Sequence, residues 1–235
     1  MDIVSGCYEG FPYWIPDGFE GDGKPQMILD KDGDYMHTGK FWDPSTKKHA
    51  EAEGPEEGPA GRAYSALPLD WDGDGDYDLI IGNDKGGLFL RENVGTAKAF
   101  AFSPECEALY ADDDLAVVPG EYAFPVAADW DGDGQMDLIS GNKEGEVWWF
   151  RNAGKKGLPQ LTKPQLLVPS SSKEGLGRGT HAQVEVCDFD GDGDLDLLVG
   201  DKYLKRENDK WDAHGYVWLY RRNGPAKAIE AAAPK

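Results

Sequence analysis

Three acidic loops carry the side chains with the clearest chemistry in this chain. They occupy residues 70–79, 129–138 and 188–197, and each reads Asp-x-Asp-Gly-Asp-Gly-x-x-Asp-Leu. Ca2+ takes about six to eight oxygen ligands at about 2.3–2.6 Å, and a short peptide can supply them only by curling around the ion. Carboxylates at alternate positions of such a loop point inward. The sequence therefore predicts three calcium sites.

The predicted ligands occupy the same five positions in every loop. Positions one, three and five supply carboxylates, and position nine closes the shell. Position seven can offer its backbone carbonyl, so its side chain is free to vary. Glycines at positions four and six tolerate the positive φ that a tight curl needs. The predicted ligands are Asp70, Asp72, Asp74, Asp76 and Asp78; Asp129, Asp131, Asp133, Gln135 and Asp137; and Asp188, Asp190, Asp192, Asp194 and Asp196.

Other interpretations of these loops are less favoured. Mg2+ demands stricter octahedral geometry and keeps its waters, and loops without Cys or His disfavour zinc and copper. A metal-free Asp-Gly turn between two strands would explain one copy. Three copies that all keep the carboxylates at positions one, three, five and nine favour the metal site over the bare turn.

The spacing of the loops predicts a repeated β-structure. Asp70 and Asp129 are 59 residues apart, as are Asp129 and Asp188, and a constant period indicates one supersecondary unit that is stacked. Each loop leads into a short apolar run that ends at glycine, which is typical of a buried strand. An aromatic strand follows at 88–90, 147–150 and 217–220, and weaker fourth strands are expected at 115–118 and 164–168. Four short strands in about sixty residues match one β-propeller blade.

The N-terminus repeats the second half of this unit, because residues 1–6 match residues 136–141. Only Asp2, at the ninth loop position, remains of its acidic loop. We therefore expect an all-β protein with about four antiparallel four-stranded blades, the first and last incomplete, as part of a larger propeller. The predicted organisation is a partial blade at 1–36, an inserted loop at 37–62, blades at 63–121 and 122–180, a partial blade at 181–225 and a tail at 226–235.

The tandem Asp-x-Asp-Gly-Asp-Gly-x-x-Asp-Leu loops at this spacing resemble the FG-GAP/VCBS repeat family. The resemblance covers nearly the whole chain except residues 37–62 and the tail. Members include the integrin α-subunit head, fungal sugar-binding propellers and many bacterial secreted proteins. The Phe-Gly and Gly-Ala-Pro elements of the integrin version are not evident, which places the chain near the bacterial branch. The resemblance implies a propeller of about seven blades with calcium in its loops, a fourth, truncated site having included Asp2.

Composition limits the partners and the location. The net charge of −20 makes nucleic acid and anionic membranes poor partners, and no run of residues is apolar enough to span a membrane. No signal peptide precedes Met1 in this chain. Extracellular calcium sites bind at about 10⁻⁴–10⁻³ M, far above cytosolic calcium. The loops and the family resemblance therefore favour a secreted, periplasmic or cell-surface protein.

Two segments interrupt the repeat, residues 37–62 and 202–214. Inserted loops on a rigid scaffold are common binding sites, so Trp42 in the first segment and Tyr203 and Trp211 in the second are candidate ligand contacts. The alternative is that both segments are ordinary solvated loops.

Two functions remain open. The first is a calcium-binding extracellular module that binds or adheres to glycan or protein ligands. The second is the propeller portion of a secreted carbohydrate-active enzyme, a polysaccharide lyase or hydrolase. No nucleophile elbow, phosphate loop or zinc motif is present, and the loop carboxylates are assigned to calcium, so no catalytic residue is predicted. The unfinished blades also predict self-association, because open sheet edges invite pairing.

Overall fold

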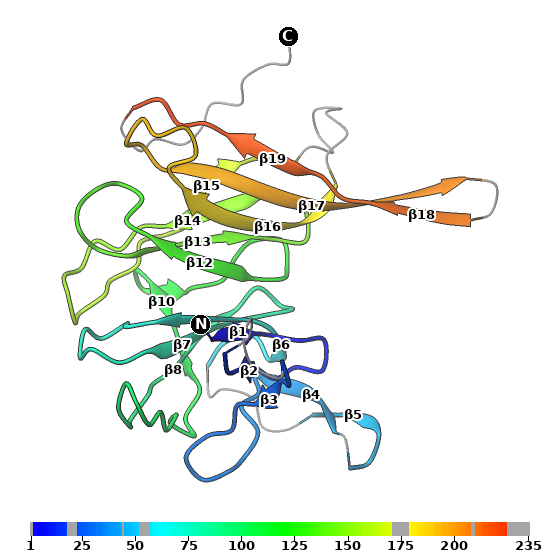
Figure 1. Ribbon diagram of the computed structural model, residues 1–235, viewed down its shortest axis with the longest axis vertical. Helices are drawn as coiled ribbons and strands as arrows, with labels where there is room; N and C mark the ends of the chain where they lie inside the picture. The colour runs from blue at the N-terminus through cyan, green and yellow to red at the C-terminus, as the bar shows by residue number, and fades with distance from the viewer. Residues whose placement is uncertain are drawn as a thin grey trace.

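The computed structural model describes residues 2–17, 23–43, 45–51, 57–170, 179–207 and 210–224. Within these ranges every regular element is a β-strand. Three blade-like sheets, the second to the fourth in chain order, follow one another along the long axis of the molecule, and the first lies beside the second (Figure 1). The expectation of an all-β chain built from propeller blades is therefore confirmed. A larger propeller of about seven blades stays a prediction.

The third blade shows the complete repeat unit, four antiparallel strands in chain order. The side chains of these strands point alternately toward the two adjoining blades. Val147 and Trp149 face the fourth blade, and Leu138 and Phe150 face the second. Burial on both faces explains why these strands are mainly apolar. The strands are β12 (Phe124–Ala128), β13 (Asp137–Gly141), β14 (Val147–Phe150) and β15 (Gln165–Val168).

The second blade has the same order but an interrupted outer strand. Its strands are β6 (Gly61–Leu69), β7 (Asp78–Asn83), β8 (Leu88–Arg91) and β9 (Glu107–Ala108). A small hairpin of β10 (Tyr110–Ala111) and β11 (Asp114–Leu115) follows β9. Val117, in the segment expected as the fourth strand, makes only an isolated bridge to Gly87. The expected outer strand at 115–118 is therefore present only as a short stretch beside the start of β8, with hydrogen bonds from Leu88 N–H to the Ala116 carbonyl at 3.1 Å and from Val118 N–H to the Gly86 carbonyl at 2.8 Å, because the β10–β11 hairpin interrupts the strand after β9.

The segment predicted as an inserted loop at 37–62 contains a hairpin. Strand β4 (Gly39–Asp43) pairs antiparallel with β5 (Lys48–Glu51) and runs parallel to the start of β6. This pairing extends the second blade to a six-stranded sheet. Residues 44 and 52–56 lie outside the described residues.

The fourth blade carries the other insertion. Strand β16 (Thr180–Cys187) pairs with β17 (Asp196–Glu207), which pairs in turn with β19 (Val217–Tyr220). Beyond the blade, β17 continues and pairs with β18 (Lys210–His214). The two form a hairpin that projects away from the stacked sheets (Figure 1). The segment predicted as a loop at 202–214 is therefore also a hairpin, and the C-terminal tail at 226–235 lies outside the described residues.

The first blade is a sheet of three strands, β1 (Ile3–Ser5), β2 (Tyr13–Ile15) and β3 (Gln26–Met27). Its glycine after β1, Gly6, lies against the backbone of Tyr64 in the second blade. The corresponding glycines Gly82 and Gly141 lie against the carbonyl groups of Ala123 and Ala182 in the blades that follow them. Each blade therefore meets the next through a glycine on its second strand, where a side chain would collide with the neighbouring backbone.

The hydrophobic core is divided among these blade interfaces. One cluster joins the first and second blades, another the second and third, and another the third and fourth. Backbone hydrogen bonds cross the same interfaces, from Ala123 N–H to the Asn83 carbonyl at 3.0 Å and from Ala182 N–H to the Asn142 carbonyl at 2.8 Å. This fixed stacking holds the three acidic loops at equivalent places in successive blades.

Candidate metal centres

Each acidic loop connects the first and second strands of its blade, β6 to β7, β12 to β13 and β16 to β17. The structure brings together the carboxylates at positions one, three and five, with ligand atoms within 4.8 Å of one another. The glycines at positions four and six adopt the expected positive φ; in the first loop Gly73 has φ 80° and Gly75 has φ 100°. The clusters are Asp70, Asp72 and Asp74; Asp129, Asp131 and Asp133; and Asp188, Asp190 and Asp192.

The same turn shapes each loop. The carboxylate at position five accepts a hydrogen bond from the backbone N–H of position seven, at 2.9 Å in the first loop, 3.0 Å in the second and 2.9 Å in the third. A side chain that bonds the backbone two residues later forms an Asx turn. These hydrogen bonds from the backbone to the aspartates stabilise the curled shape of the loop even without a bound ion.

Two of the loops contain buried carboxylate oxygens that lack hydrogen-bond partners among the described residues. They are the Oδ1 atoms of Asp70, Asp76, Asp129 and Asp131. Buried polar atoms are normally paired, and burial together with the charges of Asp74 and Asp72 raises the pKa of Asp76. Crowded, unpaired carboxylate oxygens are what a hard divalent cation neutralises. The donor set of these loops therefore fits Ca2+.

The ninth-position aspartates have different partners. Both oxygens of Asp137 accept backbone N–H groups, from Trp130 at 3.2 Å and from Asn152 at 2.6 Å. Asp78 and Asp196 make the equivalent pairs of hydrogen bonds in their own blades. Burial raises the pKa of Asp137 to about 6. Each of these carboxylates joins the start of its loop to the end of the blade's third strand, and its predicted role as a ligand stays a prediction.

Asp2 makes part of the same connection in the first blade. Its Oδ1 accepts the backbone N–H of Asp17 at 3.0 Å, and its Oδ2 accepts Trp14 Nε1–H at 3.1 Å. Asp17 lies where Asn152 lies in the third blade, because Tyr13 pairs with Ser5 as Trp148 pairs with Ser140. The position of Asp2 thus agrees with the predicted ninth loop position.

The seventh positions differ in their surroundings. The side chain of Asp194 accepts the backbone N–H of Gly224 at 2.8 Å. Asp76 is buried with one unpaired oxygen. Gln135 lines a groove between the second and third blades.

Arginines that the sequence analysis did not single out contact two of the loops. Arg151 donates hydrogen bonds to Asp131 and, at 2.9 Å, to Asp133. Arg221 lies 3.4 Å from Asp190 at the equivalent place in the fourth blade. In the second blade this place holds Glu92. The signal in the sequence was an arginine directly after the aromatic strand in the last two repeats.

The candidate ligand contacts in the insertions do not form one site. Tyr203 is half-buried and pairs with His214 in the projecting hairpin, and Trp211 pairs with Arg206 farther along it. Trp42 pairs with His49 in the β4–β5 hairpin of a different blade. The side chains of Trp42 and Trp211 lie outside the described part of the chain.

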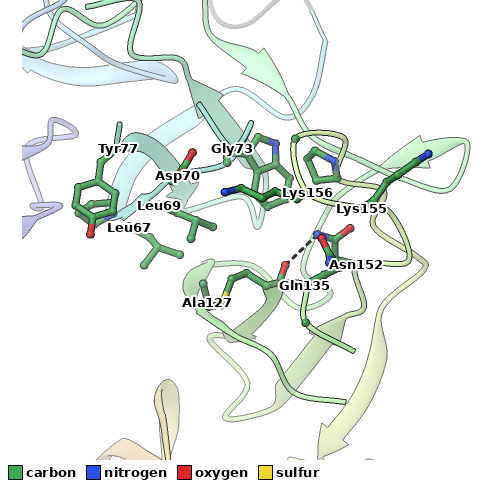
Figure 2. Close-up of a pocket in the computed structure, with 16 residues that line it drawn as sticks. Leu67, Leu69, Asp70, Gly73, Tyr77, Ala127, Gln135, Asn152, Lys155 and Lys156 are labelled. Carbon is green, nitrogen blue, oxygen red and sulfur yellow. Dashed lines mark hydrogen bonds between the residues drawn. The ribbon is translucent and has the colours of Figure 1, made fainter. Parts of the chain in front are cut away.

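Two cavities lie elsewhere, and sequence reasoning missed both because their residues are far apart in the chain. One, of about 510 Å3, lies between the second and third blades beside the first acidic loop (Figure 2). The other, of about 590 Å3, draws aromatic residues from several blades, including Tyr8, Tyr64 and Phe124.

Comparison with known proteins identifies the repeat. The model of the FG-GAP-like repeat matches twice, over residues 70–140 and 129–199, which together make up more than half of the chain. The matches include all three acidic loops. A search of curated proteins finds no match. Among the described residues, no helix has the length and apolar character that a membrane span requires. The chain belongs to the family of FG-GAP-like repeat proteins.

Proposed function

We propose that this protein is a calcium-binding, extracellular β-propeller module that binds or adheres to glycan or protein ligands. The observation that carries the calcium assignment is the set of buried carboxylate oxygens without partners in the first two loops. A propeller of FG-GAP-like repeats is typical of a ligand-binding or adhesion module. No arrangement among the described residues favours the carbohydrate-active enzyme over this module.

Calcium in these loops would act on stability. The ion would bind a folded loop whose shape depends on the neighbouring strands, so binding favours the native state. At one hundred times its dissociation constant, each ion would add about 2.7 kcal/mol to the free energy of unfolding. Weak sites of the extracellular kind need about 10⁻⁴–10⁻³ M Ca2+, and a secreted, periplasmic or cell-surface location is proposed on this ground.

The test is a calorimetric calcium titration combined with thermal melts in Ca2+, in Mg2+ and in EDTA. We expect three bound calcium ions, a higher melting temperature in Ca2+ than in EDTA, and a smaller rise in Mg2+. Equal melting temperatures in Ca2+ and EDTA would contradict the proposal. Saturation at submicromolar Ca2+ would contradict the extracellular location.

A further inference from the structure

The groove between the second and third blades combines an apolar floor with a lysine. Figure 2 shows Lys156 extending its ammonium group toward Asp70 and Gly73, while Lys155 points away from the groove. We propose that this groove binds an acidic carbohydrate, with a sugar ring on the apolar floor and the sugar carboxylate at Lys156. This inference rests on the proposed binding function and names its ligand class.

The floor and edges of the groove suit a sugar ring. Leu67, Leu69 and Trp71 are half-buried and line it, and Tyr77 and Met136 stand at its edges with 66% and 50% of their surface exposed. Aromatic side chains present flat apolar faces, and these can cover the C–H face of a sugar ring. A volume of about 510 Å3 is within the range of about 300–1,000 Å3 for small-ligand sites.

Lys156 is the charged group of the groove that can meet an anion, and it lies beside the carboxylate of Asp70, which also lines the groove. Among the residues that the structure describes, Lys156 has no ion pair and no side-chain hydrogen bond, although the chain carries a net charge of −20. Its aliphatic stem lies along Gly73 of the first loop. Calcium in that loop would add positive charge beside the ammonium group, so binding of the anion and of calcium should reinforce each other.

The neighbouring polar groups agree with a carboxylated sugar. Of the three seventh-position residues, the one that lines this groove is the uncharged Gln135, whereas Asp76 and Asp194 would repel a carboxylate. The carboxamide of Gln135 and the hydroxyl of Tyr77 are available to sugar hydroxyls. Asn152 is held by a hydrogen bond to the Met136 carbonyl at 3.1 Å and forms a fixed wall.

The lysines are a feature of this blade. The turn after the third strand closes through paired Lys155 and Leu158 here and through Thr96 and Ala99 in the second blade. Alanine occupies the place of Lys156 in the second blade, and Lys98 follows it. Lys98 is therefore a control with the same charge in an equivalent turn outside the groove.

The experiment measures binding of digalacturonate by calorimetry in millimolar Ca2+, with neutral digalactose and benzoate as comparison ligands. We expect digalacturonate to bind at least about tenfold more tightly than digalactose, as one charge-assisted contact provides. Lys156→Glu should weaken digalacturonate binding by at least about tenfold, and Lys156→Gln by less. Lys155→Glu should have a small effect, and Lys98→Glu should leave binding unchanged.

Several results would overturn the inference. These are equal affinity for the neutral and acidic disaccharides, no binding of digalacturonate, preference for benzoate, or wild-type binding by both folded Lys156 variants. Melting temperatures establish that each variant folds. Calcium titration separates the two proposals. If the protein binds three calcium ions but no digalacturonate, the proposed groove alone is overturned. If the protein binds no calcium but binds digalacturonate through Lys156, the calcium assignment alone is overturned.

Discussion

At the residue scale, the carboxylates of each acidic loop divide into two groups. Those at positions one, three and five face one another. The ninth-position carboxylate, represented by Asp137, is buried and accepts two backbone N–H groups. The first group gathers three negative charges, which arginines offset only in part in the middle and last loops, whereas the second is already satisfied by backbone hydrogen bonds. Substitutions in the two groups should therefore respond differently to calcium.

Asp137→Ala should destabilise the protein with or without calcium, because it leaves the backbone N–H groups of Trp130 and Asn152 unpaired. Buried unpaired donors of this kind cost about 1–3 kcal/mol each. Asp133→Ala should lower the free energy of unfolding mainly in Ca2+, where it removes a ligand. Urea unfolding of both variants in Ca2+ and in EDTA provides the measurement. A defect of Asp137→Ala that disappeared in EDTA would contradict this division.

Arg151 should lower the calcium affinity that the middle loop would otherwise have. It already neutralises Asp131 and Asp133, so the incoming ion must displace or oppose it. Arg151→Gln should raise the calcium affinity of the middle site by about fivefold. This factor corresponds to the free energy of about 1 kcal/mol that a partly exposed ion pair contributes. Arg221→Gln should have a smaller effect, because its contact with Asp190 is longer and more exposed.

Glu92→Gln, at the equivalent place in the second blade, is the control of opposite sign. It removes a negative charge and should therefore weaken calcium binding at the first site. Calcium titration of these variants checks the order of the sites. Weaker calcium binding by Arg151→Gln would contradict the opposing role of the arginine.

At the scale of elements, the blades are joined where a glycine meets a backbone carbonyl. A side chain at Gly141 would collide with the carbonyl of Ala182, whereas at Gly200, in the fourth blade, the nearest atom to an added Cβ is 3.7 Å away. The same residue type in the same strand position thus has two different surroundings.

Gly141→Ala should lower the free energy of unfolding by about 1–3 kcal/mol, as overpacking in a core does. Gly200→Ala should be nearly neutral, because the nearest backbone atom, the carbonyl oxygen of Gln183, lies at ordinary van der Waals distance from an added Cβ. Thermal or urea unfolding of the two variants compares them directly. A larger defect in Gly200→Ala would show that these glycines serve their own turns and not the blade interface.

The sequence was informative about elements that repeat and weak for those that do not. The strands after each loop were predicted because an apolar run ending at Gly82 or Gly141 recurs at a fixed distance from the aspartates. The β4–β5 hairpin was not predicted from the sequence. Its strand β4 pairs parallel with Gly61 and Arg62 of β6, and this pairing joins segments whose composition is typical of a loop. The contact of Arg151 with its loop also depends on folding, since twenty residues separate Arg151 from Asp131.

At the scale of the whole molecule, one blade face has no neighbouring strand within the part of the chain that the structure describes. Val147 and Trp149 of the third blade are 0% and 4% exposed beneath the fourth blade. Val217 and Leu219, at the same register positions in the fourth blade, are 72% and 39% exposed. This face of β19 has the apolar character of the buried faces but no neighbour among the described residues.

Self-association through this face is the prediction made at this scale. Sedimentation velocity should show a mass that increases with protein concentration, and Val217→Glu should shift the equilibrium toward monomer. Val94→Glu is the control, because Val94 is 50% exposed on a different blade. A monomer at every concentration would contradict the prediction.

The joint between blades also has a direction, because one side offers a glycine and the other a carbonyl. Copies that repeated this joint would meet head to tail, with Gly200 of one copy facing a first-strand backbone of the next, but the first blade has no strand in that position among the described residues. Such contacts are heterologous: they close into a ring when the rotation per copy allows it and otherwise continue as an open fibre. Self-association through Val217 and Leu219 would therefore not reproduce the joint between blades, and two copies of this apolar face could instead meet about a two-fold axis.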